Sequence, residues 1–369
     1  MFFIVFLLLW AGLHVYVLFR LHSVPFIAHH VPTPLLVSIG VFLGASYIVS
    51  RVLERFEIDS ISHVLEYIGA NWVGVFFLIF VTLFAVDVFT AFGFLFRAHI
   101  PMLRTYALAV AGILSIIAAV QAWRTPVVTE YEVTMPNLPR EADGTVLVVA
   151  SDMHLGSMLG RSWATERAAQ FDSLKPDMIL LVGDIFEGDE TTHARWLPVL
   201  QRIRAPHGVY VVTGNHELYA GPQKILELFN RAGYRVLRDE SVEPIPGLVL
   251  TGVDDLAFHG RPKHAAAVEH TLMARPVGAT VLLSHTPIQT DKASKLGVNL
   301  MLSGHTHEGQ IWPFMYLVRR VFPITSGRYN VNGMTAIVCR GTGTWGPRMR
   351  LWKRSELLRI TLRAPHRQS

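Results

Sequence analysis

Residues 145–154 read TVLVVASDMH, an apolar run that ends in a carboxylate and an imidazole. A run of this kind predicts a buried β-strand over 145–150, with a loop at its carboxyl end. Asp152 and His154 lie in that loop. Ligands and catalytic groups of α/β domains collect where strands end, so this stretch predicts both the fold class and the place of a functional site.

The same arrangement recurs four times further along the chain. Apolar runs precede Gly183-Asp184, Gly214-Asn215-His216-Glu217, His285 and Gly304-His305-Thr306-His307. Each fragment alone is common, and a purely structural interpretation makes Asp184 a helix cap, Asn215 a turn residue and His285 a core histidine. That interpretation would have to hold at five strand ends in order. We therefore favour one composite site.

The second half of the chain alternates between strand-like and helical patterns. Strand-like runs lie at 145–150, 178–182, 208–213, 248–253, 279–284, 298–303 and 334–339. Helical stretches lie near 161–174, 194–204, 221–232 and 263–273. This alternation predicts an α/β domain with largely buried strands.

The first half has the composition of a membrane domain. Of all 369 residues 51% are hydrophobic and 17% charged, yet residues 1–124 contain only six Arg, no Lys and five Asp or Glu. Four apolar segments are long enough to cross a bilayer, which takes about 20 residues per helix. We place them at 2–20, 34–52, 68–96 and 103–123.

The arginines that flank these segments do not decide the membrane orientation. Three lie on each side: Arg20, Arg97 and Arg104 against Arg51, Arg55 and Arg124. The positive-inside count is therefore tied. An even number of spans puts both termini on one side, and we expect a multi-pass protein of the cell membrane whose catalytic domain faces the cytoplasm.

The predicted organisation is a transmembrane domain over 1–124, a linker over 125–144 and an α/β domain over 145–369. The proline-containing linker also fits an entering edge strand. Asp87, within the third span, is a candidate functional residue, but we favour a carboxyl group buried between helices and bonded to His14. The single cysteine, Cys339, lies in an apolar run and is expected to be a buried structural thiol.

The residue types of the five motifs suit metal chemistry. Carboxylate, imidazole and amide ligands favour first-row ions such as Mn²⁺, Fe²⁺ or Zn²⁺, and the absence of thiolates argues against a structural zinc site. Two such ions can hold the attacking and leaving oxygens of an in-line displacement. The net charge of +5 suits an anionic substrate or lipid surface, and we expect no nucleic-acid partner.

From about 145 to 345 the chain resembles the calcineurin-like metallophosphoesterase superfamily, whose members carry D-x-H, G-D-x-x-[D/E], G-N-H-[E/D], H and G-H-x-H in this order. The resemblance implies two packed mixed β-sheets flanked by helices. It also implies two divalent ions and a phosphate-ester substrate. The first ion would be bound by Asp152, His154, Asp184 and His307. The second would be bound by Asp184, Asn215, His285 and His305.

In this scheme Asp184 bridges both ions. His216 is then the catalytic residue, which stabilises the phosphoryl oxygen or protonates the leaving group. Two positions depart from the family pattern. Glu187 stands where a second aspartate is common, and we expect it to support a ligand. Glu308 replaces a glycine, and it either faces solvent or repels an anionic substrate.

The membrane segments make the chain similar to the membrane-associated branch of the superfamily, some members of which hydrolyse the pyrophosphate of UDP-2,3-diacylglucosamine. We expect a membrane-anchored dimetal phosphoesterase acting on a phosphomonoester, phosphodiester or pyrophosphate, plausibly lipid-linked. The alternative is a non-catalytic metal-binding scaffold that recruits proteins to the membrane.

Three further features of the sequence leave alternatives open. Residues 345–354 interleave aromatic and basic side chains, as an interfacial patch or a solvated edge strand does. Residues 312–317 are either core or a hydrophobic lip for an acyl chain. The remaining histidines of the α/β domain fit no ligand motif and are expected in surface or loop positions; they are His193, His207, His259 and His264.

Overall fold

The computed structural model describes residues 2–54, 56, 58–187, 195–219, 222–255 and 261–365. The chain divides into two compact units. A helical unit comprises Met1–Trp123 together with Gly346–Trp352, and an α/β unit comprises Arg124–Trp345 together with Lys353–Ser369. His193 and His259 lie outside the described residues, and His207 is exposed.

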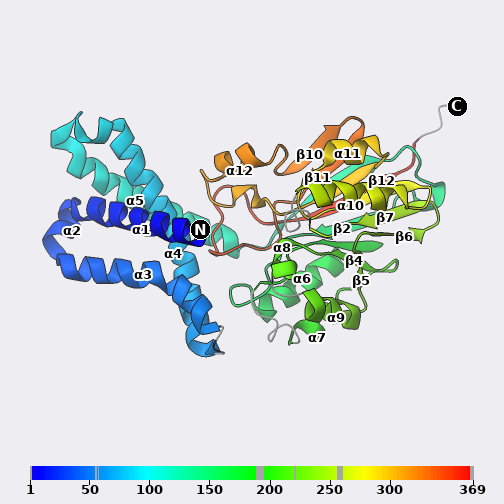
Figure 1. Cartoon of the computed structure of the whole chain (residues 1–369), viewed down its shortest axis with the longest axis horizontal. Helices are drawn as coiled ribbons and strands as arrows, with labels where there is room; N and C mark the ends of the chain where they lie inside the picture. The colour runs from blue at the N-terminus through cyan, green and yellow to red at the C-terminus, as the bar shows by residue number, and fades with distance from the viewer. Residues whose placement is uncertain are drawn as a thin grey trace. The chain divides into compact units, whose positions relative to one another are not determined.

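The α/β unit contains two six-stranded sheets, both of them mixed (Figure 1). The order of the first sheet is β1-β12-β2-β3-β4-β5, and that of the second is β10-β11-β9-β8-β7-β6. The strands of the first sheet are β1 (Val127–Thr134), β12 (Glu356–Arg363), β2 (Val146–Ala150), β3 (Met178–Val182), β4 (Val209–Val212) and β5 (Arg235–Val236). Those of the second sheet are β10 (Gly327–Val331), β11 (Met334–Val338), β9 (Leu300–Ser303), β8 (Ala279–Leu283), β7 (Leu248–Gly252) and β6 (Glu240–Ile245).

The sheets pack face to face because their strands are apolar on both faces. Along β2, Leu147 and Val149 join the core between the sheets, whereas Val148 and Ala150 join the core on the outer face. This is the two-residue period of a strand buried on both sides. The central core also contains Leu250 of β7, on the opposite sheet.

Helices cover the outer face of each sheet, as Figure 1 shows. Trp163 of α6 (Arg161–Ser173), Val199 of α7 (Leu197–Leu200) and Phe229 of α9 (Pro222–Ala232) join the core on the first sheet. Val268 of α10 (Arg261–Met273) and Ala293 of α11 (Thr290–Lys295) join the core on the second sheet. The expectation of two packed mixed sheets flanked by helices is confirmed.

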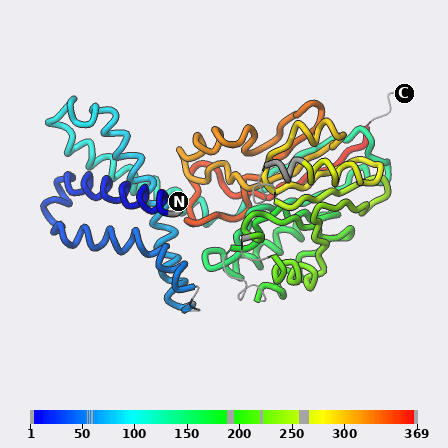
Figure 2. Tube along the Cα trace, in the orientation of Figure 1, coloured from blue at the N-terminus to red at the C-terminus, as the bar shows by residue number. Residues whose placement is uncertain are grey.

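Among the described residues, four of the twelve strands were not predicted from the sequence, namely β5, β6, β10 and β12, and β1 was one of two interpretations of its segment. β1, within the segment predicted as a linker or edge strand, pairs in parallel with β12. β12 in turn pairs antiparallel with β2, so the end of the chain lies between two segments from before residue 151 (Figure 2). β5, β6 and β10 are edge or short strands whose polar residues hide the period.

The helical unit contains five α-helices: α1 (Phe2–His22), α2 (Pro25–His30), α3 (Thr33–Glu54), α4 (Asp59–Phe89) and α5 (Ile100–Trp123). Four helical stretches are long and apolar enough to cross a membrane: Ile4–His22, Thr33–Glu54, Ser60–Phe89 and Arg97–Trp123. The sequence therefore predicts the number of such helices among the described residues correctly.

The predicted end of the third span, at residue 96, is wrong. α4 ends at Phe89, and two short 3₁₀ turns follow at Ala91–Gly93 and Arg97–His99. Phe92 and Phe96 have φ values of 55° and 53°, which an α-helix does not allow. Residues 91–96 are themselves apolar, so hydropathy continues across the break.

Residues 345–354 do not form the edge strand that was one interpretation of this segment. Within the helical unit, Arg348 places its guanidinium carbon 3.6 Å from the centroid of the Trp123 ring, a cation–π contact. The backbone N–H of Arg350 donates to the carbonyl of Ala118 at 2.9 Å. The segment between β11 and β12 thus returns to pack on α5.

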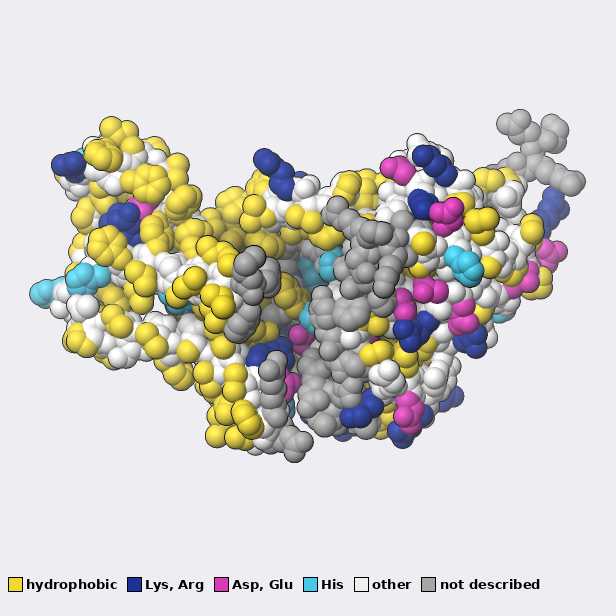
Figure 3. Space-filling model, viewed as in Figure 1, with side chains coloured by type: hydrophobic (Ala, Val, Ile, Leu, Met, Phe, Trp, Pro, Cys, Tyr) yellow, Lys and Arg dark blue, Asp and Glu magenta, His cyan; other side chains and the backbone are white. Residues whose placement is uncertain are grey.

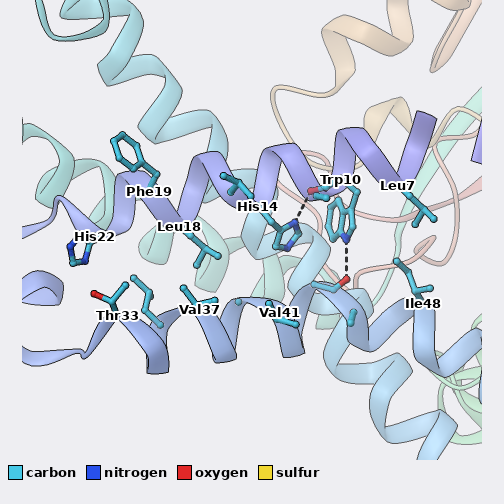
Figure 4. Close-up of a pocket in the computed structure, with 16 residues that line it drawn as sticks. Leu7, Trp10, His14, Leu18, Phe19, His22, Thr33, Val37, Val41 and Ile48 are labelled. Carbon is cyan, nitrogen blue, oxygen red and sulfur yellow. Dashed lines mark hydrogen bonds between the residues drawn. The ribbon is translucent and has the colours of Figure 1, made fainter. Parts of the chain in front are cut away.

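An apolar groove of about 660 Å³ lies between α1 and α3 (Figure 4). Gly40 and Gly44 of α3 allow close approach, since a Cβ atom at Gly40 would lie 2.7 Å from Leu18. The Trp10 indole N–H donates to the Gly44 carbonyl at 2.9 Å, which joins the two helices. Close packing at small residues is typical of membrane helices.

The carboxylate of Asp87 is fully buried near the end of α4 and is surrounded by donors. It accepts hydrogen bonds from the Tyr16 hydroxyl at 2.7 Å and from Arg104 at 2.8 Å, and Arg20 lies 2.6 Å away. The expected bond to His14 is absent from this cluster, because the His14 Nε2 instead accepts from the Trp72 indole at 3.1 Å. Asp87 therefore joins α1, α4 and α5.

We expect Asp87→Asn to lower the free energy of unfolding of the detergent-solubilised protein by about 3 kcal/mol, because the buried Arg104 and the partly buried Arg20 lose their counter-charge. Tyr16→Phe removes one neutral donor and should cost about 1 kcal/mol. Thermal unfolding followed by circular dichroism measures both. A loss of enzymatic activity in Asp87→Asn at unchanged thermal stability would contradict a structural role.

Candidate functional site

The five predicted motifs come together at one edge of the sheets. They follow β2, β3 and β4, which are parallel neighbours in the first sheet, and β8 and β9, which are parallel neighbours in the second. Parallel neighbours end at the same edge. Face-to-face packing of the sheets then brings both sets of loops to a common place.

The first group of possible metal ligands consists of Asp152, His154 and His307, whose ligand atoms all lie within 4.8 Å of one another. The Nε2 atoms of the two histidines are 3.1 Å apart, and the Nε2 of His307 is 3.3 Å from the Asp152 Oδ1. All three residues are buried. Two imidazole nitrogens and a carboxylate oxygen that converge in this way suit a divalent cation.

The second group consists of Asp184, His285 and His305, again with ligand atoms within 4.8 Å of one another. The Nε2 of His285 lies 3.0 Å from the Asp184 Oδ2. The Nδ1 of His285 lies 2.8 Å from the Val182 carbonyl, an acceptor, so Nδ1 carries a proton and Nε2 is the nitrogen that faces Asp184. A backbone acceptor often sets the tautomer of a metal-ligating histidine in this way.

Several ligand atoms have no hydrogen-bond partner among the described residues, although they are buried. They are Asn215 Oδ1, His285 Nε2 and His305 Nδ1. Buried polar atoms are rarely left unsatisfied without a reason. Bound cations would satisfy such lone pairs, so the residues present fit a dinuclear metal centre. That Asp184 bridges two ions remains a prediction, because it belongs to the second group only.

The backbone at the site is strained. Asp152, His154, Asp184, His305 and His307 all have φ values between 45° and 69°, the left-handed region that non-glycine residues avoid. Each such residue costs about 1–3 kcal/mol, and clusters of them are typical of functional sites. The hydrophobic sheets beneath the loops hold this conformation in place.

Three motif glycines are required by close approach, and a Cβ atom at the first of them, Gly183, would lie 2.5 Å from the Nδ1 of His285. A Cβ atom at Gly304 would collide with the side chains of Ser151 and Asp152, and one at Gly214 would collide with Asp184. The φ values of Gly214 and Gly304 are not in the left-handed region, whereas that of Gly183 is 76°. Only Gly183 is therefore needed for its backbone conformation.

Glu187 links the candidate catalytic histidine to the first group. Its Oε2 lies 2.7 Å from the Nδ1 of His154 and 3.0 Å from the Nδ1 of His216. A carboxylate at Nδ1 orients each ring and directs the opposite nitrogen toward the site. The His216 Nε2 is accordingly 4.0 Å from the Asp184 Oδ2. This geometry agrees with the expected supporting role of Glu187.

The charges of these groups stabilise one another. Burial raises the pKa of Asp152 and Asp184, but neighbouring histidines, above all His307 and His285 respectively, hold both pKa values far below the ordinary range. Burial opposes protonation of His216, yet the charge and hydrogen bond of Glu187 raise its pKa to about 9. Close to neutral pH, His216 therefore retains a proton in this environment.

Sequence reasoning did not assign Glu217 a role. Its buried carboxylate accepts four backbone hydrogen bonds: Oε2 from Asp184 and Gly214 at 2.9 and 2.7 Å, and Oε1 from Ile185 and Phe186 at 2.7 and 3.1 Å. A signal was present, because Gly214 precedes α8 (Asn215–Tyr219) and Glu217 is its third residue. A glutamate at this position that bonds the N-cap N–H is half of a capping box.

Glu308 neither faces solvent nor carries an unpaired charge. Its side chain is 4% exposed and lies 3.4 Å from Arg319 of α12 (Met315–Val321). Another buried carboxylate, Asp255, accepts a hydrogen bond from the Thr286 hydroxyl at 2.5 Å, one residue from His285. Both residues extend the site beyond the predicted set.

We expect Glu217→Gln to lower the free energy of unfolding by about 2 kcal/mol or more, because the amide leaves buried N–H groups without an acceptor. The loops of Asp184 and Asn215 should separate, so metal content measured by mass spectrometry should fall as well. Glu227→Gln, at an exposed position of α9, is the matched control. Unchanged melting and metal content in Glu217→Gln would contradict this role.

Comparison with known proteins agrees with this geometry. Residues 145–309 match the family model described as calcineurin-like phosphoesterase. The transmembrane protein with metallophosphoesterase domain of Danio rerio is 32% identical over 272 residues, which cover 70% of this chain and 62% of that protein. Its Bos taurus counterpart is 31% identical over 274 residues with the same coverage.

The chain thus spans about 62% of the length of these two vertebrate relatives. An uncharacterised metallophosphoesterase of Aquifex aeolicus is 32% identical over 241 residues, which cover 64% of this chain and 91% of that protein. Three observations point to the same family. They are the match to nearly the whole length of that relative, the match to the family model and the two ligand groups. With its apolar N-terminal helices, this chain is a membrane protein that belongs to the calcineurin-like phosphoesterase family.

Proposed function

We propose that this protein is a membrane-anchored phosphoesterase that uses two divalent cations to hydrolyse a phosphomonoester, phosphodiester or pyrophosphate bond. The observation that carries the proposal is the pair of buried ligand groups at the strand ends, beside a histidine held by Glu187. Soft ligands are absent from both groups, which favours Mn²⁺, Fe²⁺ or Zn²⁺.

Each ligand residue has a place in this proposal. Asp152, His154 and His307 would hold one cation, and Asp184, Asn215, His285 and His305 the other, with Asp184 shared. When bound, the cations supply Lewis-acid polarisation of the phosphoryl oxygens and neutralise their negative charge. The buried, strained loops keep the ligands in position before substrate arrives.

His216 is the group left for proton transfer. Its Nδ1 is engaged by Glu187, so the opposite nitrogen can present a proton to the leaving-group oxygen or a phosphoryl oxygen. Its backbone N–H donates to the Asp184 Oδ1 at 2.9 Å, so the main chain at His216 is fixed relative to the second ligand group, while Glu187 orients the ring. In this proposal His216 contacts a phosphoryl oxygen of the bound substrate or protonates the oxygen of the leaving group.

The proposed substrate is lipid-linked, for instance UDP-2,3-diacylglucosamine. Four helices long enough to cross a bilayer support this choice, because a substrate confined to a membrane diffuses to a membrane-bound enzyme in two dimensions. We further propose that the chain crosses the membrane several times and that the α/β unit faces the cytoplasm. A scaffold without activity would not require the complete ligand set.

We expect the purified full-length protein with added Mn²⁺ to hydrolyse a chromogenic phosphodiester and UDP-2,3-diacylglucosamine, and Asp184→Asn to reduce both below detection. The amide cannot replace a carboxylate that neutralises cation charge. Asp172→Asn, exposed on α6, is the control and should keep full activity. Undiminished turnover by Asp184→Asn would refute the assignment, and inactivity of the wild type on every ester would favour the scaffold.

We expect His216→Ala to lower kcat about 100-fold while the metal content stays that of the wild type, because proton transfer contributes about this factor. Steady-state kinetics on the chromogenic diester and metal analysis of the same samples separate the two roles. His207→Ala, at an exposed position, is the control. Equal proportional losses of metal and turnover would show that His216 is a ligand or a structural residue.

A further inference from the structure

The α/β unit exposes a cluster of large apolar side chains around α12. Phe314, Tyr316, Leu317 and Val321 are 42–64% exposed, and Trp345 is 52% exposed. We call these five residues the apolar rim. None of the residues of α12 is buried, although three of its seven are aliphatic. A soluble surface rarely gathers such side chains without a partner.

Gln310 joins the two parts of the rim. The Gln310 side-chain amide donates to the Trp345 carbonyl at 3.0 Å, and its Oε1 accepts from the Trp345 N–H at 3.0 Å. This two-point contact fixes Trp345 to the segment that leads into α12. The two hydrogen bonds therefore fix the position of Trp345 relative to the rest of the rim.

The rim borders the candidate metal centre on several sides. The Trp345 ring is 6.4 Å from the His216 ring, and Phe322, directly after α12, is 5.4 Å from the ring of His305. Arg319 of α12 pairs with Glu308, which follows the ligand His307. Whatever the rim contacts is thus brought beside the residues that would act on a phosphoryl group.

The segment that carries the rim is basic, although Arg319 pairs with Glu308 and Arg340 with Glu356. Residues 309–345 contain four arginines and no aspartate or glutamate. Two of the arginines, Arg319 and Arg320, lie on α12 itself and are exposed. Figure 3 shows basic and hydrophobic side chains side by side in this region. Aromatic and aliphatic residues mixed with arginine are typical of surfaces that lie in a membrane interface.

We propose that the apolar rim contacts the anionic surface of a lipid bilayer, with its aromatic and aliphatic side chains among the headgroups. Charge complementarity favours this partner, because arginines near an anionic leaflet are attracted to it. A bilayer is also present around any chain with four such apolar helices. The inference deepens the proposed function and rests on it only for its consequence, that the phosphoester is taken from the membrane surface.

The test uses the full-length protein in nanodiscs with and without phosphatidylglycerol. A fluorophore is attached at Leu317→Cys in one sample and at Val277→Cys in another; Val277 is 99% exposed on the same unit but outside the rim. The native Cys339 is buried and should not react. Quenching by a nitroxide on lipid acyl chains is compared with quenching by aqueous iodide.

The probe at 317 should be quenched by the lipid nitroxide and protected from iodide, more so with phosphatidylglycerol, while the probe at 277 shows the reverse. Arg320→Gln should reduce the effect of the anionic lipid about fivefold. Equal iodide access at both positions, or protection at 317 without lipid quenching, would overturn the proposal; the second result indicates a protein partner. Hydrolysis of a soluble diester by the wild type in the same nanodiscs tests the proposed function separately.

Discussion

The site depends on one buried carboxylate, that of Glu217. Its four hydrogen bonds to backbone N–H groups join the loop after β3 to the loop after β4. A buried charge is tolerated only where its hydrogen bonds are complete, and a carboxylate that accepts four of them meets this condition. Asp184, Asn215 and His216 take their positions from these two loops, so their arrangement follows from a residue that touches no substrate.

The hydrogen bonds of Glu217 matter because the loops that they join are strained. Five candidate ligands have left-handed backbone conformations, and three glycines are required because a Cβ atom would strike a neighbouring ligand loop. Such conformations persist only when the surroundings determine them. The strands beneath are fully buried and apolar, and their packing provides the stability that offsets the strain.

The same principle of a compensated charge operates in the helical unit. Asp87, Arg20 and Arg104 are acceptable in a bundle of apolar helices because they face one another between helices. The α/β unit shows the opposite feature, a rim of apolar side chains that face outward beside arginines. A buried charge without a counter-charge and an exposed apolar surface without a partner both cost free energy. The arginines around Asp87 remove the first cost, and the proposed contact of the rim with lipid removes the second.

The sequence by itself determined the features that depend on local composition. Seven buried strands, four apolar helices and the motif residues were predictable because each is marked by a run of side chains or a fixed spacing. The edge strands were harder: β1 and β12 are far apart in sequence, and the β10–β11 hairpin was missed although Asn332-Gly333 is a known hairpin signal. Only the tertiary structure decided that Glu217 joins two loops, that Glu187 serves two histidines and that Asp87 pairs with arginines instead of His14. The cited contacts connect residues that are 17 to 71 positions apart, and no local pattern in the sequence selects such a partner.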